Sequence, residues 1–154
     1  MNAPLNKMLA DLVSWLNSAP GIDGRPTLAS LVRSITLDAA PQGALPYVVI
    51  DVTGGDRNQG TQDHGLANQT MWEHTVQINC DATSGPESRE IAAAMESAMD
   101  RLPQFTGGNS TIFQAAKFQG EFAQVNQNAT EGINQDSEST YRHSISFTIL
   151  YHQS

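Results

Sequence analysis

The sequence predicts an α+β fold: a mainly antiparallel sheet with two long-looped hairpins and helices packed on one face. Residues 70–81 and 141–152 alternate between apolar and polar side chains, which is the period of a half-buried strand. Residues 4–18, and a later segment that ends before Pro103, instead carry apolar residues at helical spacing. Strands therefore stand before and after one helix, an order typical of α+β domains.

The first predicted helix covers residues 4–18. Its apolar positions recur every three or four residues: Leu5, Met8, Leu9, Leu12, Val13 and Leu16. Pro4 suits the first turn of a helix, and the Ala-Pro-Gly sequence at 19–21 ends it. A short helical turn within 27–33 and a short strand within 34–38 are expected next.

The first predicted hairpin joins the strands 47–52 and 70–81. The former is short, β-branched and aromatic, as buried strands are, and Gly54-Gly55 ends or bulges it. Residues 56–69 contain almost no apolar side chains, and a loop of this length is usually functional or disordered. In the second strand the apolar side chains share one face, and polar side chains share the other. The apolar face consists of Trp72, His74, Val76, Ile78 and Cys80.

The second predicted hairpin follows a helix. That helix starts at a capping-box sequence, Ser-Gly-Pro-Glu at 84–87. An extended segment at 112–125, with a bend or bulge at Gly120, precedes a second polar loop at 126–139. The last strand, 141–152, alternates again and completes the sheet.

Composition limits the possible functions. The length predicts one domain, 1–154, with a core large enough to need no metal or disulfide. A net charge of −8 argues against nucleic acid or an anionic membrane as the main partner, because both require a basic face. No apolar run is long enough to span a bilayer, and the N-terminus lacks signal-peptide features. We therefore expect a soluble protein made in a cytoplasm.

Candidate chemical groups are few. His74 and His143 lie on the inward faces of two predicted strands and could be neighbours, although no metal-binding spacing is present. Hydrogen-bonded core histidines are the simpler interpretation. Cys80 could be a nucleophile, but it lies on an apolar face, where cysteine usually acts as a small apolar side chain. His64 and His152 are expected to be solvated. The sequence predicts no catalytic, cofactor-binding or metal-binding site.

An ordered set of motifs resembles the tail-completion or tail-terminator proteins of long-tailed bacteriophages. The motifs are PQGALPYVV at 41–49, VQINC at 76–80, an Ala-rich helix around 91–95, and YRHSISFTILY at 141–151. The resemblance covers roughly residues 28–153, and the two long polar loops depart from the family pattern.

The resemblance implies a structural virion protein and not an enzyme. Such a protein forms a homo-hexameric ring that caps the tail tube, stops its polymerisation and joins the tail to the head connector. Its partners are further copies of itself, the tail tube protein and the head-completion or connector protein. DNA passes through the lumen without specific binding, and no cofactor or membrane is involved. The protein is made in the host bacterial cytoplasm and resides in the tail-neck region.

Two alternatives stay open. One is another phage neck or tail-tip structural component, and the other is a small metal- or thiol-dependent enzyme that uses His74, His143 and Cys80. For a ring-forming protein, the polar loops are the expected contact regions, because loops usually carry function. The predicted ring or tube contacts are Arg57, Asp63, His64, Glu131, Asp136 and Glu138. Trp15 and Trp72 are expected to be core or rim anchors.

Overall fold

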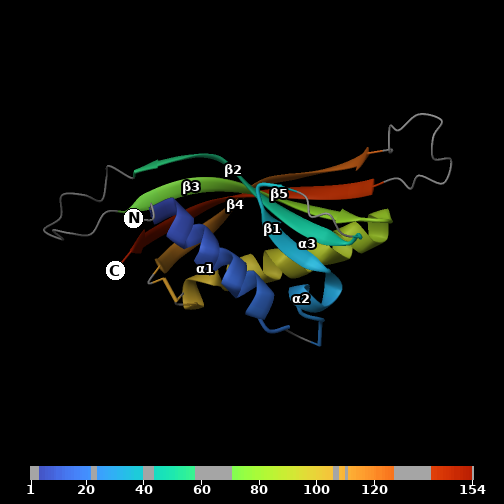
Figure 1. Ribbon diagram of the computed structural model, residues 1–154, viewed down its shortest axis with the longest axis horizontal. Helices are drawn as coiled ribbons and strands as arrows, with labels where there is room; N and C mark the ends of the chain where they lie inside the picture. Colours follow the sequence, from blue (N-terminus) through green and yellow to red (C-terminus); the bar gives the residue numbers. More distant parts are fainter. Residues whose placement is uncertain are drawn as a thin grey trace, which may run out of the picture.

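A computed structural model describes the chain in seven stretches, and its helices lie on one side of a five-stranded sheet (Figure 1). The described residues are 4–21, 24–39, 44–57, 71–105, 108–109, 111–126 and 140–153. The elements are α1 (Pro4–Ser18), α2 (Leu28–Leu31), β1 (Ser34–Leu37), β2 (Tyr47–Arg57), β3 (Trp72–Ala82), α3 (Gly85–Asp100), the 3-10 helix η2 (Leu102–Gln104), β4 (Thr111–Asn126) and β5 (Thr140–Gln153). This arrangement confirms the predicted α+β fold.

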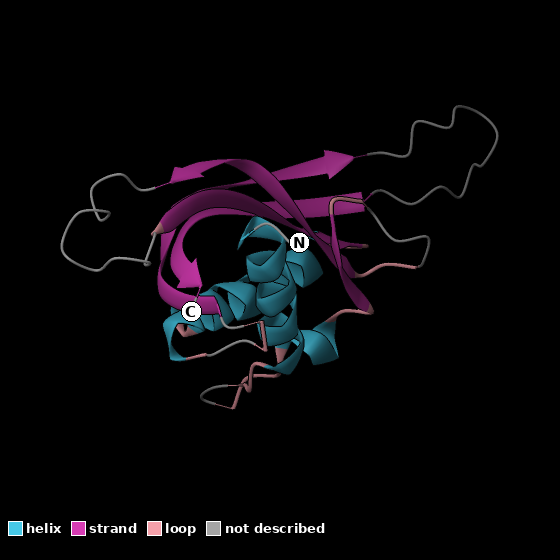
Figure 2. Ribbon diagram, turned by 60° about the vertical axis from the view of Figure 1, so that its left-hand side comes forward, coloured by secondary structure: helices cyan, strands magenta, loops and turns pink. Residues whose placement is uncertain are grey.

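The strand order in the sheet is β1-β2-β3-β5-β4. Strands β2 and β3 pair antiparallel, as do β3 and β5 and then β4 and β5, whereas β1 pairs parallel to β2. Both predicted hairpins, β2–β3 and β4–β5, are therefore present. Figure 2 shows the sheet curving over the helices. Strands β1 and β4 form the two edges of the sheet.

The hydrophobic core lies between the helices and the sheet face that they cover. Strand alternation sends the apolar side chains of β2, β3 and β5 into this core, because successive residues point to opposite faces. The buried core includes Met8, Leu12 and Leu16 of α1, Ile91, Met95 and Met99 of α3, and Ile78, Cys80, Ile145, Phe147 and Ile149 of the sheet. Trp15 belongs to the core, whereas Trp72 packs against it partly buried.

Two side chains fix α1 against the rest of the molecule. The Trp15 indole Nε1 donates a hydrogen bond of 2.7 Å to the carbonyl of Ala98 in α3. Asp11 is a charged residue on the apolar face of α1, and it is only 1% exposed. Its Oδ1 accepts hydrogen bonds from the backbone and side-chain nitrogens of Asn109, and its Oδ2 accepts one from the Thr111 backbone nitrogen. This carboxylate therefore holds the start of β4 onto α1.

Strand β2 runs further than the sequence predicts. It continues to Arg57, so two residues assigned to the polar loop 56–69 belong to the strand. The register shifts between Val52 and Gly54, which confirms a bulge and not a strand end at the Gly54-Gly55 pair. Gly55 has a φ of 152°, and a Cβ there would lie 2.7 Å from the Glu73 carbonyl oxygen and against the His74 ring. Glycine therefore permits the pairing of β2 with β3 to continue past the bulge.

The predicted capping box opens α3. The Ser84 hydroxyl accepts a hydrogen bond from the Glu87 backbone nitrogen at 3.2 Å, and the Glu87 carboxylate accepts one from Thr83 at 3.3 Å. Within the described part of the chain, no helix has the length and apolar character needed to cross a membrane.

Candidate functional site

The histidines and the cysteine proposed from the sequence do not form one site. In the β3–β5 register Cys80 is opposite His143, whereas His74 is opposite Ile149. Six residues of strand separate His74 from Cys80, which is about 20 Å. The expectation that His74 and His143 are neighbours is therefore wrong, because the pairing register places them at different ends of the sheet.

Each of the two histidines has a hydrogen-bond partner, and the cysteine is enclosed in the core. His74 Nδ1 lies 3.0 Å from the Tyr151 hydroxyl, and His143 Nε2 lies 2.6 Å from Glu121 Oε2. Cys80 is completely buried, and burial raises the pKa of its thiol far above the ordinary range. The reactive thiolate is therefore suppressed at neutral pH. These surroundings fit hydrogen-bonded core groups and not a nucleophile–base pair.

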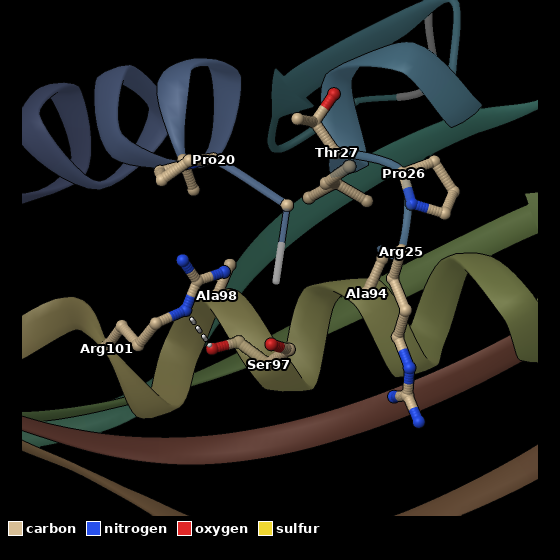
Figure 3. Close-up of a pocket in the computed structure, with 11 residues that line it drawn as sticks. Pro20, Arg25, Pro26, Thr27, Ala94, Ser97, Ala98 and Arg101 are labelled. Carbon is tan, nitrogen blue, oxygen red and sulfur yellow. Dashed lines mark hydrogen bonds between the residues drawn. The ribbon is translucent and has the colours of Figure 1, made fainter. Parts of the chain in front are cut away.

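Four cavities among the described residues are either very small or open to solvent. A small enclosed cavity lies between the α1–α2 connection and α3, and Figure 3 shows Arg101 at its side, where Nε donates to the Ser97 carbonyl at 3.1 Å. Its volume of about 10 Å³ holds one water molecule at most. Three wider hollows of about 310, 370 and 530 Å³ are open to solvent. Among described residues, no three His, Cys, Asp or Glu side chains are grouped to hold a metal.

The sheet face opposite the helices carries a buried polar network. Asn79 is its centre: its Oδ1 accepts from Ser144 Oγ at 2.6 Å and from Gln77 Nε2 at 2.9 Å. Its Nδ2 donates to Asp51 Oδ2 at 3.1 Å. These bonds satisfy groups that would otherwise be costly to bury. The network therefore ties β2, β3 and β5 together through their side chains.

An ion pair extends this polar face. Arg142 Nε and Nη2 donate to the two oxygens of Asp81 at 2.8 and 3.0 Å. The Asp81 side chain is completely buried, whereas that of Arg142 is 29% exposed. The hydrogen bond to Asp81 raises the pKa of Arg142 above its usual value, so the guanidinium is charged at any physiological pH.

The exposed apolar residues lie elsewhere, on the edges of the sheet. Four large apolar side chains in the described residues are exposed: Leu37 at 36%, Phe118 at 49%, Phe122 at 48% and Val125 at 53%. Leu37 belongs to β1 and the other three to β4. Edge strands with exposed apolar side chains are surfaces on which another chain can pair. The sequence analysis missed these four residues, since strand periodicity does not show which strands become edges.

The structure does not place most of the predicted contact residues. Asp63, His64, Glu131, Asp136 and Glu138 lie outside the described residues. Arg57 is the last residue of β2, and only its backbone is described. These six residues therefore remain predictions.

A small acidic cluster lies between α3 and the β4–β5 pair. Burial, and after it the charges of Glu121 and Asp100, raises the pKa of Glu96, while His143 lowers it. Ionised Glu96 consequently costs the folded state some stability. That cost is absent below the pKa of the unfolded chain, about 4.3, and grows as pH rises through the higher folded-state pKa.

We expect Glu96→Gln to raise Tm at pH 7 by of the order of 1 °C, a small value because the group is partly exposed. The difference from the parent protein should shrink as pH falls towards about 4. Thermal melts from pH 4 to 8 measure this, with Glu90→Gln, an exposed position on the same helix, as the control. A Glu96→Gln benefit that is constant with pH would contradict the role of ionisation.

Comparison with known proteins gives a family and a fold. The family model described as "Tail completion protein gp17" matches residues 23–152. A solved chain from the "virion of native gene transfer agent (GTA) particle" has the same fold, with a TM-score of 0.59 and 16% identity over 99% of both chains. A second solved chain, at TM-score 0.44 and 15% identity over 96% of both chains, is too distant to support an argument. No curated protein matches the sequence.

Proposed function

Since this chain belongs to the tail completion protein gp17 family, we propose that it forms a homo-hexameric ring that caps the tail tube, stops its polymerisation and joins the tail to the head connector. Membership of the family makes the chain a structural, non-enzymatic protein of the virion tail. It also confirms the resemblance drawn from the sequence motifs. The ring, its position at the tube end and its partners are the proposal.

The observation that carries the proposal is the extent of the family match. Residues 23–152 include α2, α3, the strands β1 to β4 and all but the last residue of β5, so the match concerns nearly the whole fold and not a single motif. The site geometry is consistent with this assignment. The buried polar side chains around Asn79 hydrogen-bond to one another, and the exposed large apolar side chains of the described residues lie on the sheet edges. This combination suits a protein whose task is assembly.

The charge of the chain also fits the proposed position. A ring of such subunits around a DNA passage carries a net charge of −8 per copy. Negative charge repels phosphate, so DNA would pass without being held. We propose that the polar-loop residues Arg57, Asp63, His64, Glu131, Asp136 and Glu138 contribute to contacts with the next copy or with the tube.

Light-scattering mass combined with negative-stain imaging, with and without purified tail tubes, tests the proposal. We expect a particle of six times the 16.6 kDa chain mass, or rings seated on tube ends. A chain that stays monomeric and ignores tube ends would contradict it. Rings that bind a head connector but never a tube end would instead assign the protein to another place in the neck.

A further inference from the structure

The exposed apolar residues mark both edges of the sheet and spare its interior. Strands β2, β3 and β5, which have neighbours on both sides, carry none of the four large exposed apolar side chains among the described residues. Edge strands present unpaired backbone groups, and proteins normally protect them with charge, proline or a covering element. Here each edge combines backbone hydrogen-bonding groups with exposed apolar side chains.

The first edge is long. Strand β4 has 16 residues, and in the described part of the chain it pairs only with β5. The register places Phe118 opposite Phe147 and Val125 opposite Tyr141, on the face that packs against the helices, and places Phe122 opposite Ser144 on the other face. Phe118 is held edge-on against Phe147, at 6.0 Å between ring centroids. The β4 edge thus exposes large apolar side chains on both faces of the sheet, beside the exposed Lys117 and Glu121.

The second edge has two parts. Strand β1 pairs with β2 only from Tyr47 to Ile50, so residues 51–57 of β2 have no strand beside them among the described residues. Leu37 is opposite Ile50, a core residue, and therefore lies on the helix side. This β1–β2 edge, which consists of β1 and residues 51–57, is the only other edge of the described sheet.

We infer that the β4 edge of one copy pairs with the β1–β2 edge of the next copy, so that the sheets of neighbouring subunits become continuous. The inference rests on the proposed ring. Two unlike edges at opposite ends of one sheet give a head-to-tail contact, and such a contact closes into a ring when the rotation per subunit is suitable.

A second copy is favoured over a foreign partner because the two edges complement each other on both faces. On the helix side, Leu37 of one copy would meet Phe118 or Val125 of the next. On the opposite face, alternation puts Lys117 of β4 with the Thr148 and Thr75 row, and puts Asp51 of the β1–β2 edge on that same face. The opposite charges of Lys117 and Asp51 therefore lie on the same face of the joined sheet, and the exposed side chains of Leu37, Phe118 and Val125 lie on the other.

Edge-blocking substitutions test the inference. Val125→Lys blocks the β4 edge and Leu37→Lys blocks the β1–β2 edge, since a lysine at the junction would have to be desolvated. We expect each variant alone to be a monomer at concentrations where the parent chain is a ring, with assembly weakened by at least about tenfold. An equimolar mixture of the two should form a dimer, because one intact edge of each kind remains. Phe122→Lys provides a second β4 block, and Ala10→Lys, on an exposed position of α1, is the control that keeps the ring.

The outcomes separate this inference from the proposed function. Circular dichroism and thermal melts establish that each variant is folded before its mass is measured. A ring in the parent and in all three edge variants overturns the edge pairing and leaves the proposed function standing. A dimer formed by Leu37→Lys alone overturns the head-to-tail arrangement in favour of a two-fold contact. Rings from the Val125→Lys and Phe122→Lys variants that no longer bind tubes assign the edge to the tube protein and overturn the inference. A parent chain that never forms a ring, alone or on tubes, overturns both.

Discussion

Arg142→Met is expected to lower the free energy of unfolding by about 3 kcal/mol. The substitution removes both hydrogen bonds to Asp81, whose side chain is completely buried, and so leaves a carboxylate without its charge partner. We place the effect at the lower end of the range for broken buried pairs because Arg142 is partly exposed. For a chain of this length the loss corresponds to a fall in Tm of about 6–12 °C. Urea denaturation followed by circular dichroism measures it.

The cause is tested by a second substitution in the same protein. Replacing both partners, as Asp81→Leu with Arg142→Met, removes the buried charge together with the cation and should recover most of the lost stability. Arg89→Met, at an exposed position on α3, is the matched control and should change stability by less than about 0.5 kcal/mol. If Arg142→Met lowers the free energy of unfolding no more than Arg89→Met does, solvent screens the ion pair and the expected stabilisation by Arg142 is contradicted.

Asp11→Ala is the second substitution with a large expected effect, again about 3 kcal/mol. It removes three hydrogen bonds to a carboxylate that is 1% exposed, including those that the backbone nitrogens of Asn109 and Thr111 donate to Asp11. The better helix propensity of alanine offsets only about 0.5 kcal/mol. Urea denaturation gives the total, and hydrogen exchange at the Thr111 amide reports the local loosening of β4.

Two variants make this prediction specific. Asn6→Ala, an exposed position on the same helix, should leave stability almost unchanged. Asp11→Asn keeps the shape but has one acceptor oxygen in place of two, so its cost should be intermediate. Equal stability of Asp11→Ala and the parent chain would show that the carboxylate does not fix the start of β4.

Elements with a clear period could be predicted from the sequence. The 4–18 helix, the capping box at 84–87 and the alternating strand at 141–152 depend on local spacing and are present in the structure. Gly54-Gly55 signalled a bulge for the same reason, because glycine relaxes local backbone constraints. The extension of β2 to Arg57 was not predicted, since cross-strand pairing with β3 and not composition sustains it.

Buried polar groups were harder to predict. The alternation of β3 placed Asn79 and Asp81 on its polar face, yet both are buried, because partners on β2 and β5 enclose and satisfy them. Asp11 gave a usable signal, since it interrupts the apolar stripe of its helix three residues after Met8 and four before Trp15. A lone acid on an apolar stripe must find hydrogen-bond donors elsewhere in the fold.

The sequence by itself determined the fold class, the two hairpins, the bounds of the first helix and, through ordered motifs, the family. All of these follow from residue spacing along the chain, which local sterics and periodicity translate into structure. Only the tertiary structure decided which strands are edges, that His74 and His143 are separated, and that the exposed apolar residues lie on β1 and β4. These depend on the order and register in which strands pair across long sequence distances. No local pattern contains that information. The alternation of a strand is the same whether a strand of its own chain or a strand of another chain pairs with it.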